Sequence, residues 1–177
     1  MEYNGKKFEA IIATPGAGKS FLCDRSPAFV DADEIKLRLK YHVPYTVTRA
    51  ELEKTKGERH FEKNRDYTFD RLYKALDMAR RAGKIIIAPP NPEFWDYMQS
   101  RNIPFCFVYQ AHNTRDELVK RYRERNNPES TVQEFAGEKQ FESHYKRNLQ
   151  ENRATVKYQF SANEYLADIL IKFGCKF

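Results

Sequence analysis

Residues 8–20 read Phe-Glu-Ala-Ile-Ile-Ala-Thr-Pro-Gly-Ala-Gly-Lys-Ser, an apolar run followed at once by a glycine-rich turn that ends in Lys19 and Ser20. The turn matches the Walker A pattern G-x-x-x-x-G-K-[ST], with Ala13 in place of the first glycine. In such a turn, small residues let backbone N–H groups point inward at phosphate, the lysine reaches the β- and γ-phosphates, and the serine hydroxyl binds Mg²⁺. An ordinary turn between a strand and a helix needs no Lys-Ser after its glycines. The segment therefore predicts a strand, a phosphate-binding loop and a helix.

The departure at Ala13 leaves this prediction intact, because Ala is small and adopts ordinary β dihedrals where a strand ends. We expect the nucleotide to be bound by Thr14, Pro15, Gly16, Ala17, Gly18, Lys19, Ser20 and Phe21.

Around this segment, short apolar runs alternate with longer helical patterns, which is typical of a parallel sheet wrapped by helices. We expect strands at 8–13, 28–30, 84–88, 103–109 and 156–160. We expect helices at 19–23, 32–40, 63–82, 92–101, 115–126, 132–152 and 163–173. The pattern predicts a three-layer α/β fold with a five-stranded parallel sheet in one domain over 1–177. Two segments interrupt the alternation, and we interpret 41–62 as a flap and 110–152 as a helical lid.

Composition narrows the class of protein and of partner. Lys plus Arg number 31 and Asp plus Glu number 25, so the formal charge is +6, and 41% of the residues are hydrophobic. That apolar share is enough to fill a core, and no apolar run approaches the roughly 18 residues of a membrane span. The absence of a signal-peptide pattern and of a paired cysteine spacing predicts a cytoplasmic protein with reduced thiols. The basic excess favours an anionic partner, either a phosphorylated small molecule or nucleic acid.

Asp31 and Asp33 stand where the second strand should give way to a helix. Ligand sites of doubly wound sheets collect beyond the carboxyl ends of the strands, so both acids should face the crevice that holds the phosphate loop. One carboxylate would join Ser20 in holding Mg²⁺, directly or through water, and the other would accept the proton of an attacking hydroxyl. The alternative is structural, with Asp33 as the N-cap of a helix that begins at Glu34 and Asp31 as a turn residue.

The third strand ends in Pro89-Pro90-Asn91, without the acidic residue of a Walker B strand. That absence leaves the metal to Asp31 or Asp33. It also argues against a mechanical ATPase or helicase, which relies on such an acid to hold Mg²⁺ and arrange water.

The basic stretch 115–125 follows the fourth strand and carries Arg121 and Arg125 one helical turn apart. The planar guanidinium suits phosphate oxygens, so we expect at least one of these arginines to contact a transferring phosphoryl group. The alternative is a solvated basic helix held by Glu–Arg pairs. The flap and the following helix offer further stacking and basic side chains, with little specificity: Tyr41, Tyr45, Arg49, Arg59, Arg65, Tyr67, Asp70 and Arg71.

These features together resemble the P-loop kinases of the nucleoside-monophosphate-kinase-like group, and most closely small phage and bacterial members with a Pro-Gly-x-Gly-Lys-Ser loop and an Asp-x-Asp second strand. The resemblance runs from Phe8 to about Leu170 and is carried by 14–20, 31–33, 105–109, 117–125 and 164–170. It implies ATP, Mg²⁺ and transfer of the γ-phosphoryl group to a nucleotide-like acceptor. The Asp-Gly-[FY]-Pro-Arg signature that adenylate kinases place after the third strand is missing, which leaves the acceptor open.

Three functions follow as hypotheses. The first is a kinase that converts (deoxy)nucleoside monophosphates to diphosphates, with Lys19, Asp31, Asp33, Arg121 and Arg125 as catalytic residues. The second is a kinase of nucleic acid, acting on a 5′-hydroxyl end or on a hydroxymethyl-pyrimidine base in DNA. The positive charge favours it, and a carboxylate pair suits deprotonation of a neutral hydroxyl. The third is a non-catalytic nucleotide-binding module.

Overall fold

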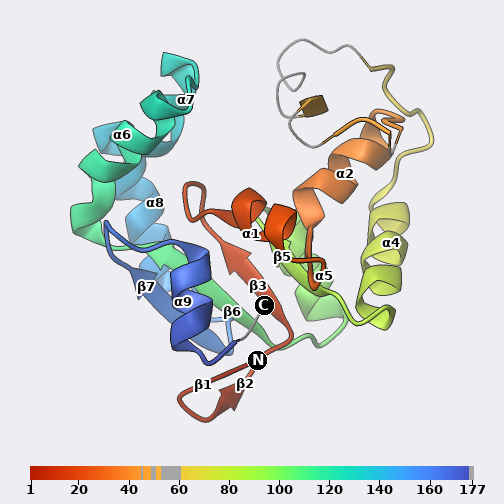
Figure 1. Cartoon of the computed structure of the whole chain (residues 1–177), viewed down its shortest axis with the longest axis horizontal. Coiled ribbons are helices and arrows are strands. Elements are labelled where there is room, and N and C mark those ends of the chain that lie inside the picture. Colours follow the sequence, from red (N-terminus) through yellow and green to blue (C-terminus); the bar gives the residue numbers. More distant parts are fainter. Residues whose placement is uncertain (45, 49–50, 53–60, 176–177) are drawn as a thin grey trace.

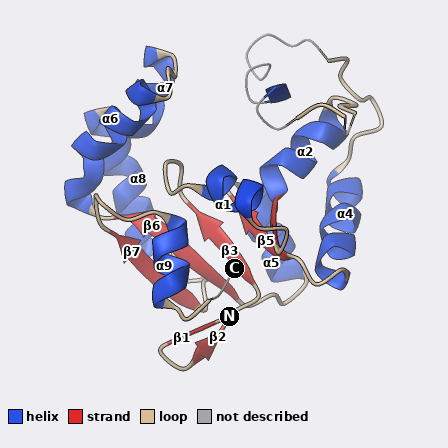
Figure 2. Cartoon of the chain, in the orientation of Figure 1, coloured by secondary structure: helices blue, strands red, loops and turns tan. Residues whose placement is uncertain are grey.

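The computed structural model describes residues 1–44, 46–48, 51–52 and 61–175. Its main sheet has five strands: β3 (Ala10–Ala13), β4 (Phe29–Asp31), β5 (Ile85–Ala88), β6 (Phe105–Gln110) and β7 (Val156–Phe160). All neighbours run parallel, in the order β4-β5-β3-β6-β7 (Figures 1 and 2). The helices of the described residues are α1 (Lys19–Arg25), α2 (Ala32–Lys40), α4 (Phe69–Arg81), α5 (Pro92–Ser100), α6 (Arg115–Glu124), α7 (Glu129–Ala136), α8 (Glu138–Gln150) and α9 (Leu166–Lys172). The α/β class and the five-stranded parallel sheet are confirmed.

The central strand β3 separates two cores, because successive side chains of a strand point to opposite faces. Ala10 and Ile12 lie in a core with apolar residues of α4 and α5, whereas Ile11 and Ala13 lie in a core with residues of α1 and α9. Helices therefore cover both faces of the sheet, and β3 is buried on both. Such burial explains why the strand reads as a continuous apolar run instead of an alternating one.

A third apolar cluster holds the predicted lid together. It joins Leu118 and Tyr122 of α6, Val132 and Ala136 of α7, and Phe141 of α8. Figure 1 shows α6, α7 and α8 gathered on one side of the chain and α2 with α4 on the other.

The predicted helix over 132–152 is wrong in one respect, since the structure has two helices that meet at Gly137. The Gly137 backbone is extended, with ψ 141°, and a Cβ there would lie 2.4 Å from the carbonyl oxygen of Gln133. A side chain would collide with the preceding turn, so glycine is needed for the break.

The predicted helix over 63–82 begins later, at Phe69. Asn64 is tied to the end of α2: its backbone N–H donates to the Lys40 carbonyl at 2.8 Å and its side-chain amide donates to the Leu39 carbonyl at 2.8 Å. Thr68 then caps α4 by accepting the N–H of Arg71 at 3.3 Å. Local side-chain bonds of Asn and Thr compete with helix formation, which explains the delayed start.

A short hairpin at the N-terminus went unpredicted. β1 (Glu2–Tyr3) pairs with β2 (Lys6–Lys7) around Asn4 and Gly5, which both have positive φ. An Asn-Gly pair between strands is a strong hairpin signal, so the sequence contained the information. None of the described helices is long and apolar enough to cross a membrane.

The start of the predicted flap is fastened to α2 by Arg38. Its guanidinium pairs with Glu34 at 2.7 Å and donates to the carbonyls of Pro44 and Val47, each at 2.9 Å. Tyr45, Arg49 and Arg59 lie outside the described residues.

Candidate functional site

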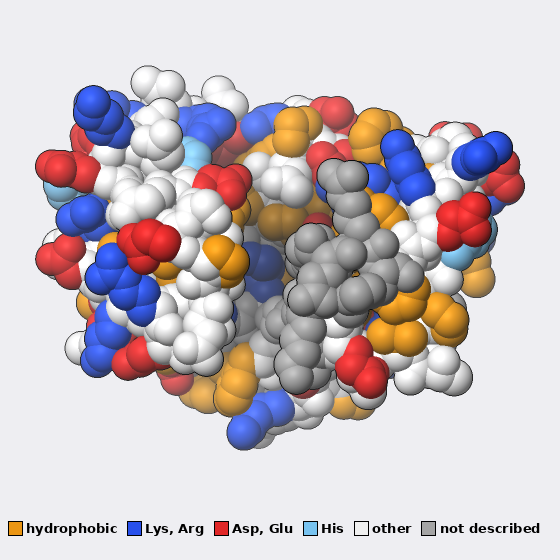
Figure 3. Space-filling view, turned by 90° about the horizontal axis from the view of Figure 1, so that it is seen from above, with side chains coloured by type: hydrophobic (Ala, Val, Ile, Leu, Met, Phe, Trp, Pro, Cys, Tyr) orange, Lys and Arg blue, Asp and Glu red, His pale blue; other side chains and the backbone are white. Residues whose placement is uncertain are grey.

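A cavity of about 720 Å³ lies at the carboxyl ends of β3, β4, β5 and β6. Its size falls within the range of about 300–1,000 Å³ that is usual for small-molecule sites. Viewed from above, the molecule is hollowed near its centre, and a basic side chain is visible inside (Figure 3). The cavity brings together the predicted Thr14, Lys19 and Ser20 of the loop with Asp31 and Asp33 of the second strand and helix. The expectation that these two parts of the sequence face one crevice is confirmed.

The loop keeps its shape through two glycines with left-handed backbones. Gly16 has φ +84° and Gly18 has φ +91°, values that side-chain-bearing residues rarely adopt. Neighbours also approach both positions closely: a Cβ on Gly16 would lie 2.6 Å from Cδ2 of Leu118, and one on Gly18 would lie 3.2 Å from Cδ1 of Tyr165. The loop is therefore packed from outside by α6 and by the segment before α9.

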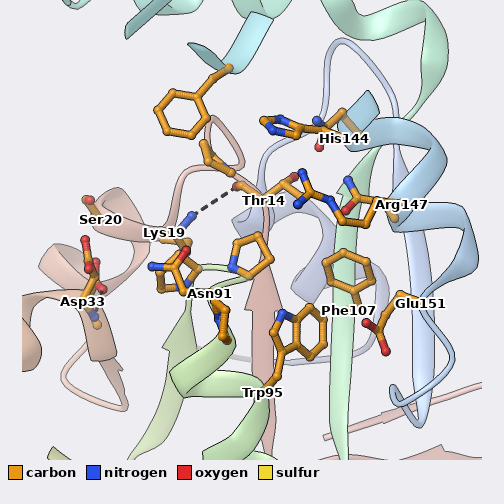
Figure 4. Close-up of a pocket in the computed structure, with 18 of the residues that line it drawn as sticks. Thr14, Lys19, Ser20, Asp33, Asn91, Trp95, Phe107, His144, Arg147 and Glu151 are labelled. Carbon is orange, nitrogen blue, oxygen red and sulfur yellow. Dashed lines mark hydrogen bonds between the residues drawn. The ribbon is translucent and has the colours of Figure 1, made fainter. Parts of the chain in front are cut away.

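Lys19 begins α1 and folds its ammonium back over the loop. Its Nζ donates to the carbonyl of Ala13 at 2.9 Å and to that of Thr14 at 3.1 Å, and Figure 4 shows the latter bond. The ammonium thus lies against the turn where phosphate is expected. Ser20 lies beside it, on the side of the cavity occupied by Asp33 (Figure 4).

Asp31 caps the helix α2, whatever chemical role it has. Its Oδ1 accepts the backbone N–H of Asp33 at 2.9 Å, which makes Asp31 the N-cap of α2. The capping alternative therefore named the wrong residue: α2 begins at Ala32 and Asp31 is its cap. Asp31 is 7% exposed, whereas Asp33 in the first turn is partly exposed to the cavity. The carboxylate better placed to meet an incoming ligand is Asp33.

Arg121 and Arg125, the two arginines of the predicted lid, do not line the cavity. Arg121 is only 4% exposed and bonds Oε1 of Glu117 at 3.1 Å, the carbonyls of Gly16 and Glu164 at 3.4 Å each, and the carbonyl of Ala162. Its guanidinium also lies 4.0 Å from the ring centroid of Tyr165. Arg121 therefore stabilises the loop through its bond to the Gly16 carbonyl. Arg125 is exposed at the C-cap of α6.

Other basic residues line the cavity instead, and the sequence reasoning did not single them out. His144 and Arg147 come from α8, and Arg153 follows it. Figure 4 shows His144 and Arg147 on the side of the cavity away from Ser20 and Asp33. Burial, and then the charge of Arg147, lower the pKa of His144, which favours the neutral form of its imidazole. Their positions depend on the break at Gly137, so one continuous helical pattern could not identify them.

Four of five buried side-chain atoms that lack a hydrogen-bond partner within the described chain belong to residues of this cavity. They are Oγ1 of Thr14, the hydroxyl of Tyr122, Oε1 of Gln110 and Nδ2 of Asn148. Buried polar groups nearly always have partners, so each exception calls for an explanation, such as a catalytic role or a bound water or ion. None of the described flap or neighbouring residues Tyr41, Arg65, Tyr67, Asp70 and Arg71 lines the cavity.

The donors near Lys19 fit Mg²⁺ shared with phosphate. Ser20, Asp31 and Asp33 offer hard oxygen atoms, and no group of three or more His, Cys, Asp or Glu side chains in the described residues is arranged to hold a metal by itself. Mg²⁺ typically takes one or two carboxylates and completes its shell with water and substrate phosphates, so the sparse donor set is compatible with it.

Comparison with the models of known protein families gives no match, and comparison with curated proteins gives none either.

Proposed function

We propose that this chain is an ATP-dependent phosphotransferase of the P-loop kinase type that converts a (deoxy)nucleoside monophosphate to the diphosphate. The observation that supports the proposal most is the meeting of Lys19, Ser20 and Asp33 in one cavity at the carboxyl ends of parallel strands. Phosphoryl transfer depends on positioning and on neutralising charge, and these residues supply a cation, metal-binding oxygens and a carboxylate.

The loop would bind the triphosphate through backbone N–H groups, and Lys19 would exchange its two carbonyl contacts for β- and γ-phosphate oxygens. Mg²⁺, held by Ser20 and the neighbouring carboxylates, would supply charge neutralisation. In the transfer, an acceptor oxygen forms a bond to the γ-phosphorus while the bond from that phosphorus to the β–γ bridging oxygen breaks, and ADP leaves. With a hydroxyl acceptor, Asp33 would take the proton.

The lid would contribute positive charge through Arg147 and exclude water through the aromatic rings of Tyr122 and Phe135, which line the cavity with it. A kinase needs such exclusion to avoid transferring the phosphoryl group to water. Arg121 would act indirectly, because it fixes the Gly16 carbonyl and the packing of α6 on the loop.

A kinase of nucleic acid is the second candidate. The position of Asp33 favours it, since a carboxylate exposed to the cavity can deprotonate a neutral hydroxyl, whereas an anionic phosphate acceptor needs no base. The +6 charge of the chain adds support.

The test is transfer of label from γ-labelled ATP to a panel of deoxynucleoside monophosphates and to single-stranded and duplex DNA with 5′-hydroxyl ends or hydroxymethyl-pyrimidines. Label in diphosphates alone supports the first function, and label in DNA alone supports the second. ATP binding without transfer to either would leave a non-catalytic nucleotide-binding module. Lys19→Ala should abolish transfer, whereas Lys139→Ala, at an exposed position of α8, should leave it unchanged.

A further inference from the structure

We propose that Gln110 and Asn148, which both line the cavity, recognise the nucleobase of the acceptor. That the bound base belongs to the acceptor rests on the proposed function, but binding of a base at this site can be tested without ATP.

Both side chains are buried and each leaves a polar atom without a partner. Gln110 is 3% exposed and Asn148 is 8% exposed. No hydrogen bond within the described residues reaches Oε1 of Gln110 or Nδ2 of Asn148, so the two amides do not bond each other through these atoms. A buried, unsatisfied amide atom costs about 1–3 kcal/mol of stability, a cost that a ligand contact would remove.

The backbones that carry these amides are firmly held. Gln110 ends β6 in register with Phe160 of β7. Asn148 lies in the last turn of α8, where its carbonyl accepts Nζ of Lys157 at 3.0 Å. The site therefore presents one acceptor and one donor from rigid elements, which is the arrangement that specific recognition needs.

Flat side chains also line the cavity. The ring of Phe107 in β6 packs edge-on against the ring of Trp95 in α5, with centroids 5.1 Å apart. The guanidinium of Arg153 lies 4.5 Å from the centroid of the indole ring. Glu151 holds Arg153 in place through bonds of 2.9 Å to Nε and 2.5 Å to Nη2. Figure 4 shows Trp95, Phe107 and Glu151 together, opposite Asp33.

A flat heterocycle with a donor and an acceptor on one edge matches this arrangement. Every nucleobase carries adjacent donor and acceptor groups on its pairing edge, and proteins read an unpaired base by that edge while aromatic side chains or Arg planes lie along its faces. A sugar or a bare phosphate has no flat face to lie along the aromatic side chains that line the cavity. The observations therefore favour a nucleoside unit over a phosphorylated sugar.

Trp95 is the only tryptophan of the chain, so its fluorescence reports this site directly. We would titrate the full chain, without ATP or metal, with the four deoxynucleosides and with deoxyribose 5-phosphate, which has no base. The expected result is saturable quenching by at least one nucleoside and none by the sugar phosphate at equal concentrations. Equal responses to the two ligands, or no response to any nucleoside, would overturn the proposal.

Near-isosteric apolar variants separate recognition from folding. Gln110→Met and Asn148→Leu should each weaken nucleoside binding about tenfold, the scale of one lost hydrogen bond in a buried site. Neither should lower the melting temperature, because each removes a polar atom that has no partner. Gln140→Met, at an exposed position of α8, should change neither property. A lower melting temperature with unchanged binding would instead assign the two amides a structural role.

The two proposals fail separately. Nucleoside binding without transfer of label to any acceptor would overturn the phosphotransferase and keep the base site. Transfer by the wild-type chain with no effect of either amide variant on binding would overturn the base site and keep the phosphotransferase.

Discussion

Substitution of Gly16 by Ala probes the junction between the glycine-rich loop and α6. The backbone there has φ +84°, and a Cβ would lie 2.6 Å from Cδ2 of Leu118 in α6. The left-handed conformation costs a residue with a Cβ about 1–2 kcal/mol. Overpacking against a buried leucine adds about 1–3 kcal/mol, and the lower half of that range applies because the end of the Leu118 side chain can shift. We expect Gly16→Ala to lower the free energy of unfolding by about 2–4 kcal/mol.

Gly83 provides the matched control. Its φ is +76°, and nothing lies within 4 Å of the position that a Cβ would take. Gly83→Ala should therefore cost only the backbone part, about 1–2 kcal/mol. The difference between the two variants measures the contact with α6.

A double-mutant cycle tests this contact by urea unfolding of the wild type, Gly16→Ala, Leu118→Ala and the double variant Gly16→Ala/Leu118→Ala. Gly83→Ala is measured beside them as the control. Shortening Leu118 should relieve the contact, so Gly16→Ala should cost about as much as Gly83→Ala in that background. Equal costs of Gly16→Ala with and without Leu118 would refute the close packing of α6 on the loop. Affinity for a fluorescent ATP analogue should fall with Gly16→Ala and stay unchanged with Gly83→Ala.

Four further outcomes are expected. Asp33→Asn should slow transfer at least a hundredfold by single-turnover assay while unfolding stays near wild type, since its side chain supplies a charge and not the cap. Arg121→Ala should destabilise the chain by about 3 kcal/mol or more in urea unfolding, because the carbonyls it pairs with would stay buried. Arg147→Ala should slow transfer without a comparable loss of stability. Burial raises the pKa of Glu164, but bonds from Lys172, Ser161 and Tyr158 outweigh it and lower that pKa to about 2. The resulting stability should be complete above about pH 4.5 and decline as the pH falls towards 2, and Glu164→Gln should flatten this decline in a series of acid melts.

Local patterns in the sequence predicted the sheet and the part of the cavity that Thr14, Lys19, Ser20, Asp31 and Asp33 line. Strand β3 is apolar because it is buried on both faces, and its loop follows directly in the chain, so Thr14, Lys19 and Ser20 needed no long-range information. Asp31 and Asp33 could be placed at the same edge because carboxyl ends of parallel strands share it. Proximity in sequence and the shared edge of parallel strands were therefore enough to place these five residues together.

The lid half could not be predicted in the same way. Arg121 was expected at phosphate on the strength of its type and spacing, yet its direction depends on the contact of α6 with Gly16 and Tyr165, which is a tertiary fact. Arg147 and Asn148 come to the cavity because the chain turns at Gly137, and an amphipathic pattern on either side of a break looks continuous in sequence. Buried amides such as Gln110 leave no periodic signal at all.

The bonding of the loop itself bears on which charge it accepts. Four of its carbonyl oxygens accept bonds from other groups: Lys19 pairs with those of Ala13 and Thr14, Arg121 with that of Gly16, and the backbone N–H of Leu166 with that of Ala17 at 2.7 Å. Two of these partners, Lys19 and Arg121, are cations, so they neutralise the negative ends of the peptide dipoles in the loop. The polar groups that such a loop offers to a ligand are donors, and a concave set of backbone donors attracts anions. Lys19 is the one partner in this set that can leave its carbonyls for a phosphate, because it extends over the cavity while Arg121 is buried. An anion entering the loop would therefore replace the carbonyls on Lys19 and meet a frame that Arg121 keeps in place, which is why Lys19 is expected to control transfer and Arg121 stability.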